Sequence, residues 1–200
     1  AAQYVGFVET VRRAEQALAS GAPTDDGKAL PLTAAVARYL FKLMAYKDEY
    51  EVARLHTDTT FLAKLDAQFE GDYTLNYHLA PPLWNHAADG QLPTKHRYGA
   101  WMRKAFSVLA PLKVLRGGPL DVFGYSAERR SERALISEYR AAIESMLPLL
   151  SARNRDAAAA FARVPEQIRG FGHVKARHLA AARKQWDTLL EQFHTAARGA

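Results

Sequence analysis

The sequence contains no cysteine among its 200 residues. The chain can therefore form no disulfide, hold no zinc through thiolates, supply no thiolate nucleophile and ligate no iron–sulfur cluster by itself. It also lacks any run approaching the roughly 18 apolar residues of a membrane span, so we expect a soluble protein with no membrane partner. Gly-x-Ser-x-Gly, phosphate-loop and HExxH motifs are missing as well. The residues alone thus indicate no reaction, and we predict no catalytic residue, no metal ligand and no cofactor within this segment.

The composition is that of an ordinary globular protein, with 48% hydrophobic and 24% charged residues. These proportions exclude intrinsic disorder, and the length fits one sizeable domain. We therefore predict a single helical domain over residues 1–200. The chain opens with Ala1 and Ala2 rather than Met, while the next residues already show a helical pattern. We expect a segment of a longer polypeptide, with a cleaved signal peptide as the alternative.

Apolar residues recur three and four positions apart along most of the chain, which predicts helices. We expect them over residues 3–19, from about 32 on to 55, and over 58–69, 97–112, 126–146, 154–163 and 174–197. Gly21 and Pro23 are typical of a helix end, and Ser126 is a plausible N-cap. The fold class predicted is mostly α: an irregular multi-helix bundle with at most one small β-hairpin or strand pair.

One stretch, residues 72–79, alternates instead, with tyrosine or leucine at every second position. This alternation predicts an extended strand, which needs a pairing partner for its backbone. Residues 122–125 form the only other short β-like run, so we predict them as its mate. Aromatic residues in two stretches are predicted to belong to the core: Tyr73, Tyr77 and Trp84, then Tyr98, Trp101 and Phe106.

The net charge of +6 is unevenly distributed. Residues 95–133 hold nine lysines and arginines against three acidic residues, whereas residues 1–94 hold eight against twelve. This asymmetry favours an anionic partner or an acidic protein surface, although a solvated helix face is the simpler interpretation. Nucleic acid is not expected, because no lysine- and arginine-rich 5–8-residue run occurs.

Two places in the sequence could contact an anion. Arg129 and Arg130 fall in the first turn of a predicted helix, where the helix dipole disfavours cations, so we expect a carboxylate such as Asp72 or Asp121, or a bound phosphate, beside them. The Gly170-Phe171-Gly172 turn would offer free backbone N–H groups, with an ordinary helix start as the alternative. The predicted anion-binding or interface residues are Lys95, Arg97, Arg129, Arg130, His173 and Lys175.

Four ordered segments together resemble one family. They are EGDYTLNYHLAPPLW at 70–84, LRGGPLD at 115–121, FGYSAERR at 123–130 and IRGFGHVK at 168–175. In this order they resemble the C-terminal region of single-chain indolepyruvate ferredoxin oxidoreductases. The resemblance covers most of residues 35–190.

The resemblance implies a parent enzyme that depends on thiamine diphosphate and iron–sulfur clusters, oxidatively decarboxylates an aryl pyruvate to an acyl-CoA, and passes electrons to ferredoxin. It implies a cytoplasmic homo-oligomer whose catalytic domains lie upstream, and none of the family's catalytic residues maps onto this sequence. We therefore expect a non-catalytic C-terminal accessory domain that serves assembly or contacts an anion such as the CoA phosphates. A purely structural or dimerisation module without a ligand is the alternative.

Overall fold

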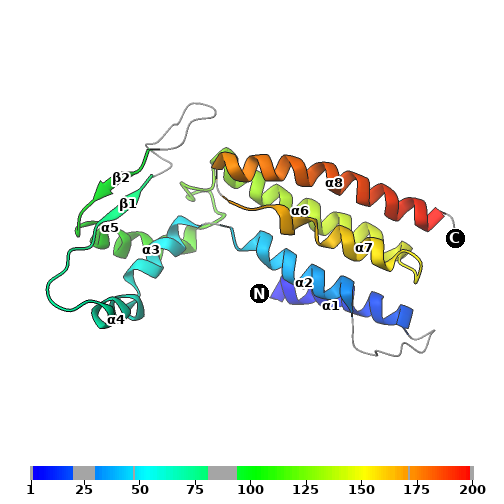
Figure 1. Ribbon diagram of the computed structural model, residues 1–200, viewed down its shortest axis with the longest axis horizontal. Helices are drawn as coiled ribbons and strands as arrows, with labels where there is room; N and C mark the ends of the chain where they lie inside the picture. The colour runs from blue at the N-terminus through cyan, green and yellow to red at the C-terminus, as the bar shows by residue number, and fades with distance from the viewer. Residues whose placement is uncertain (1, 20–29, 47, 81–93, 171, 199–200) are drawn as a thin grey trace. The chain divides into compact units, whose positions relative to one another are not determined.

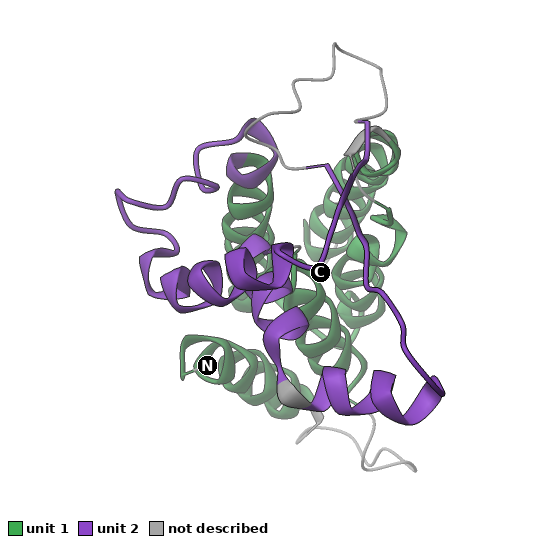
Figure 2. Cartoon of the chain, turned by 90° about the vertical axis from the view of Figure 1, so that its left-hand side faces the viewer, with its two compact units in different colours: residues 1–46, 131–200 green, residues 47–130 purple. Residues whose placement is uncertain are grey.

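The computed structural model describes residues 2–19, 30–46, 48–80, 94–170 and 172–198. The chain divides into two compact units: unit 1 comprises residues 1–46 and 131–200, and unit 2 comprises residues 47–130 (Figure 2). Within the described ranges the protein is a mostly α, multi-helix bundle with a single two-stranded antiparallel sheet, which confirms the predicted fold class. That residues 1–200 form a single domain stays a prediction. No helix in the described ranges is both long and apolar enough to cross a membrane.

The helices and strands divide between the two units. Unit 1 holds α1 (Ala2–Ala19), α2 (Pro31–Met44), most of α6 (Ala127–Met146), α7 (Arg155–Ala162) and α8 (Gly172–Arg198). Unit 2 holds α3 (Glu49–Thr57), α4 (Thr59–Gln68), β1 (Tyr77–Leu79), β2 (His96–Tyr98), α5 (Met102–Leu109) and the 3-10 helix η1 (Ala110–Leu115). Two further 3-10 turns, Leu147–Leu149 and Val164–Gln167, flank α7.

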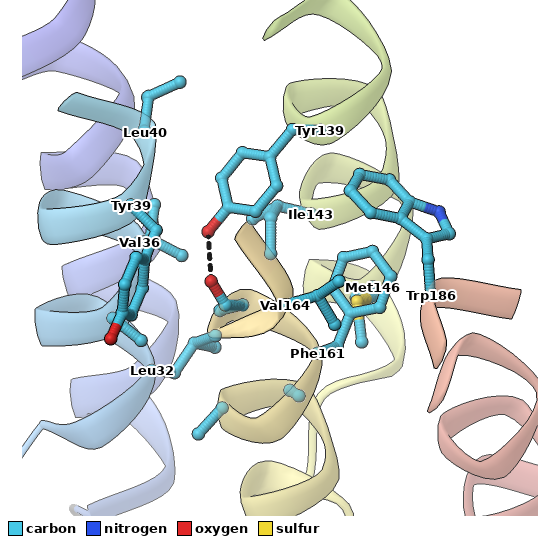
Figure 3. Close-up of a cluster of buried hydrophobic side chains, with 14 of the residues drawn as sticks. Leu32, Val36, Tyr39, Leu40, Tyr139, Ile143, Met146, Phe161, Val164 and Trp186 are labelled. Atoms are coloured by element: carbon cyan, nitrogen blue, oxygen red, sulfur yellow. Dashed lines mark hydrogen bonds between the residues drawn. The ribbon is translucent and has the colours of Figure 1, made fainter. Parts of the chain in front are cut away.

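The core of unit 1 is built from the apolar faces of its five helices. Figure 1 shows α6, α7 and α8 side by side, and α7 also packs on α2. At the centre Phe161 packs between Tyr139 and Trp186, with ring centroids 6.5 and 4.6 Å apart (Figure 3). The Tyr139 hydroxyl donates to the carbonyl of Ala162 at 2.9 Å, so this buried phenol is satisfied. Burial also raises the pKa of Tyr139, which keeps it a neutral donor.

A buried carboxylate joins α1 to the start of α2. Glu15 accepts the backbone N–H groups of Leu32 at 3.0 Å and Thr33 at 2.8 Å, and it accepts the Thr33 hydroxyl as well. Pro31 opens α2 and Leu30 supplies no side-chain cap, so the glutamate from another helix replaces the local cap. A negative charge is favourable there because a helix N-terminus carries a partial positive charge.

The small sheet of unit 2 differs from the one we predicted. Strand β1 covers only Tyr77–Leu79, and it pairs with β2, Tyr77 opposite Tyr98. The predicted mate, residues 122–125, is wrong: the Asp121 carboxylate accepts the N–H of Gly124 at 3.1 Å and holds this stretch in turns. The helix predicted from residue 97 begins at Met102, because the preceding residues belong to β2 and its turn.

The helix predicted to run from residue 32 to residue 55 is also broken in two. Helix α2 ends at Met44, and α3 begins at Glu49. Asp48 lies at the start of α3 and accepts the N–H of Tyr50 at 3.1 Å. A side-chain cap of this kind begins a new helix rather than continuing the old one.

Candidate functional site

The six predicted site residues fall in both units. Lys95 and Arg97 lie at β2 of unit 2, where both are exposed and make no ion pair with another described residue. Arg129 and Arg130 lie in the first turn of α6. The remaining two, His173 and Lys175, belong to α8 of unit 1. The side chain of His173 lies outside the described residues.

Arg129 is buried and paired. Its guanidinium lies 2.8 Å from a carboxylate oxygen of Glu49 on α3, and its backbone N–H donates to the Ser126 hydroxyl at 3.2 Å, so Ser126 caps α6 as predicted. The sequence predicted a compensating carboxylate, but Glu49 was not among the two acids that we singled out. By contrast Arg130 is exposed and donates to the carbonyl of Tyr125 at 2.6 Å. The helix start is thus stabilised within the protein itself.

The segment between η1 and α6 is organised around a buried acid. Asp121 accepts the N–H groups of Gly117 at 2.8 Å and Gly124 at 3.1 Å, and the hydroxyl of Tyr50 at 3.2 Å. Gly117 has a φ of +77°, a conformation that favours glycine and explains this residue in the Leu-Arg-Gly-Gly-Pro-Leu-Asp motif. Burial and the nearby Asp121 raise the pKa of Tyr50, so the phenol remains a donor. Sequence analysis missed this tyrosine, since its partner lies 71 positions away.

Lys175, the predicted site residue of α8 whose side chain is described, also has an acidic partner. Lys175 forms an ion pair with Glu132 of α6, and both belong to unit 1. Gly170 has a φ of +85°, and a Cβ on it would come within 2.8 Å of the Val174 side chain. This glycine therefore has a structural reason of its own. Phe171 lies outside the described residues, so both interpretations of the turn, an anion site and an ordinary helix start, stay predictions.

A group of large apolar side chains is exposed in unit 2, from the start of α5 to the segment before α6. Trp101 is 59% exposed and Val114 is 86% exposed. We call this group the apolar surface of unit 2; it consists of Trp101, Val108, Leu112, Val114, Leu120, Val122 and Tyr125. The prediction that Trp101 is a core residue is wrong, because α5 begins after it and buries Met102 and Phe106 instead. Tyr73, also predicted for the core, is 39% exposed, and Trp84 lies outside the described residues.

His56 of α3 lies within an aromatic cluster in unit 2. Its ring stacks on Phe106 with centroids 5.2 Å apart and meets Phe61 and Tyr77 edge-on. Burial lowers the pKa of His56, because these rings offer no compensation for a positive charge. Its Nδ1 atom is buried and has no hydrogen-bond partner among the described residues.

This environment predicts that acid destabilises unit 2. In the unfolded chain histidine binds a proton near pH 6.5, whereas the folded protein binds it only at lower pH. The stability that is present above about pH 6.5 should therefore fall as the pH drops toward the folded pKa. Thermal unfolding at pH 7.5 and 5.5 measures the loss, which should be smaller in His56→Phe. The exposed His78 provides the control, and His78→Gln should lose as much thermal stability at pH 5.5 as the wild type. An equal loss of stability in the wild type, His56→Phe and His78→Gln would contradict the prediction.

No group of three or more histidine, aspartate or glutamate side chains in the described ranges is arranged to hold a metal ion. The buried Arg129 of unit 2 pairs instead with Glu49. The site therefore has two accessible parts, the exposed cations of β2 and the apolar surface of unit 2.

Comparison with known proteins places the chain in a family. A family model described as "Family of unknown function (DUF6537)" matches residues 1–188. The chain belongs to this family. No curated protein and no solved structure matches it.

Proposed function

We propose that this chain is a non-catalytic C-terminal accessory domain of a 2-oxoacid:ferredoxin oxidoreductase, of the type that oxidatively decarboxylates an aryl pyruvate to an acyl-CoA. Its role is assembly: it docks on the upstream catalytic domains of a cytoplasmic, homo-oligomeric parent enzyme. The resemblance of the four ordered motifs supports the choice of parent. The apolar surface of unit 2 supports the role.

That surface is the observation that carries the role in assembly. These exposed apolar residues are close in sequence, between residues 101 and 125, and apolar side chains that gather on a surface mark contact sites for other proteins. Along the sequence the exposed residues run from Trp101 to Tyr125 and include Val114 of η1, which is 86% exposed. Arg103 and Lys104 follow Trp101 on α5 and make no side-chain ion pair with another described residue. An apolar contact with an acidic rim is therefore the complementary partner surface.

The cofactors of such an enzyme do not fit residues of this chain. An iron–sulfur cluster needs thiolate ligands, and the sequence has no cysteine. Gly71, Asp72 and Tyr73 lack the second glycine and the downstream asparagine of a thiamine-diphosphate motif, and Asp72 is exposed. In the proposal both cofactors, and the contact with ferredoxin, belong to the upstream domains.

The proposal is tested by sequencing the gene upstream of Ala1 and by binding measurements with the product. We expect the upstream sequence to encode thiamine-dependent domains, and these domains to bind this chain in analytical ultracentrifugation. Val114→Asp should weaken that binding by about tenfold or more, since a charge is then buried in the contact. Val5→Asp, an exposed valine of α1, is the matched control and should have little effect.

Two results would decide against this role. In the first, the chain dimerises by itself, Val114→Asp abolishes the dimer, and the chain does not bind the upstream domains. This result would instead support the purely structural or dimerisation module. Turnover of a 2-oxoacid by the isolated chain would contradict the proposal outright.

A further inference from the structure

Four cations of unit 1 lie around one carboxylate, and the proposed function uses none of them. Arg38 and Lys42 are four positions apart on α2, while Arg163 and Arg169 lie on either side of the 3-10 turn Val164–Gln167. We call these four residues the basic cluster of unit 1. Like charges four positions apart on a helix repel each other, so the arrangement costs stability unless a negative group compensates it.

Hydrogen bonds to the backbone hold two of the cations together. The Nζ atom of Lys42 donates to the carbonyl of Pro165 at 2.8 Å and to that of Glu166 at 2.9 Å. The Nε atom of Arg169 donates to the same Glu166 carbonyl at 3.2 Å. Burial lowers the pKa of Lys42, and the charge of Arg169 lowers it further, because the two cations repel each other. The 3-10 turn thus fixes Lys42 and Arg169 close to each other.

The carboxylate of Glu166 is bound to a phenol instead of a cation. It accepts the hydroxyl of the buried Tyr39 at 2.8 Å. Within the described ranges it makes no ion pair with Arg163 or Arg169, although each lies three positions from it. Burial and the hydrogen bond to Glu166 raise the pKa of Tyr39. The charges of Arg38 and Arg163 oppose this rise, so both guanidinium groups lie near the phenol.

The charges of the cluster are therefore not balanced inside the protein. Arg38 and Arg163 are exposed, and neither guanidinium makes an ion pair or hydrogen bond with another residue that the structure describes. Four cations against the single carboxylate leave three positive charges in excess. Other exposed arginines of unit 1 differ in this respect, since Arg12 pairs with Glu9 and Arg183 with Glu138.

A phosphate group has the charge and the acceptors that this excess requires. It carries up to two negative charges and three or more acceptor oxygens, and the planar guanidinium of arginine matches its geometry. A single carboxylate has one charge and two oxygens, and would leave more of the cluster unpaired. We infer that the basic cluster of unit 1 binds a phosphate group, with Arg38 and Arg163 as its direct partners. This inference uses only residues of unit 1, so it does not depend on the proposed parent enzyme.

Titration of the full chain with inorganic phosphate, at pH 7.5 and constant ionic strength, tests the inference. We expect the backbone amide resonances of residues 163–169 to shift with a dissociation constant of roughly 1–10 mM. Arg163→Gln should weaken binding by about five- to tenfold, because a charge-assisted hydrogen bond is lost. The matched control is Arg153→Gln, which removes an exposed arginine before the opposite end of α7 and should leave the affinity unchanged.

The carboxylate allows a test with the opposite sign. Glu166→Gln should tighten phosphate binding by about threefold or more, because a repelling charge is removed while the amide oxygen can still accept the Tyr39 hydroxyl. Glu191→Gln removes an exposed acid of α8 and should have no such effect. Equal phosphate affinities in the wild type and Glu166→Gln would contradict the site.

A phosphate ester distinguishes two sources of the group. Glycerol 3-phosphate that binds as tightly as inorganic phosphate would support a site for phosphate esters. A preference of about tenfold or more for inorganic phosphate would support a site for the free ion. Both results agree with the inference.

Three outcomes would overturn the inference. The first is no shift of these amide resonances with phosphate at about 50 mM. The second is equal weakening by Arg163→Gln and Arg153→Gln, which would show only general attraction by a basic surface. The third is equally tight binding of acetate, which would show that the cluster does not select a phosphate group.

Discussion

Replacing Arg129 with methionine is expected to lower the free energy of unfolding by about 3–5 kcal/mol. The guanidinium is 8% exposed and Glu49 is 14% exposed, so the variant leaves a carboxylate buried without its cation. A buried unpaired charge costs far more than the pair contributes. Chemical denaturation followed by circular dichroism measures the loss, and amide hydrogen exchange should show it first in α3.

The neighbouring arginine provides the matched control. Arg130→Met removes the same charge from the same helical turn, but this side chain is exposed and only contacts a backbone carbonyl, so we expect a change below about 1 kcal/mol. The double variant Arg129→Met/Glu49→Leu should recover much of the lost stability, because the Glu49 carboxylate is then removed together with its cation. Equal destabilisation by the two single variants would show that Arg129 stabilises the protein only through general charge effects.

Phe161→Ala is expected to destabilise unit 1 by a comparable amount, about 3–5 kcal/mol. The side chain is fully buried and touches Tyr139 and Trp186 at the centre of the core (Figure 3). Its removal loses apolar contact and leaves a cavity among helices that cannot easily close around it. Thermal and denaturant unfolding, followed by the near-ultraviolet signal of Trp186, measure this loss.

The control for this substitution is a phenylalanine of the same unit. Phe41 on α2 is 63% exposed, and Phe41→Ala should cost less than about 1 kcal/mol. A similar cost for both variants would contradict the arrangement of the core, since burial would then not distinguish the two rings. A cost near zero for Phe161→Ala would contradict it equally.

The long helices could be predicted because their own sequences contain the necessary information. In α6 and α8 apolar residues recur with helical spacing, and Ser126 supplies the cap that the sequence predicted. The strand pair could not be assigned in the same way. Three residues such as His96–Tyr98 contain too little pattern to distinguish a strand from the start of a helix, and pairing depends on distant partners.

The candidate site was only partly predictable for a similar reason. The charge asymmetry is visible in the sequence, but the ion pair of Arg129 with Glu49 joins residues 80 positions apart, and no local rule identifies such a partner. The exposure of Trp101 depends on where α5 begins, and thus on the strand that was missed. Tyr77 was predicted as a core residue and is buried, yet only the structure reveals its unpaired hydroxyl.

Unit 1 is assembled from both ends of the described chain, with unit 2 inserted between them in the sequence. During synthesis α1 and α2 are made before unit 2, whereas α7, which packs on α2, is made after it. Closing such a long loop costs conformational entropy, and an inserted unit that folds early shortens it. In this chain the two parts of unit 1 can therefore meet only after the whole of unit 2 has been made.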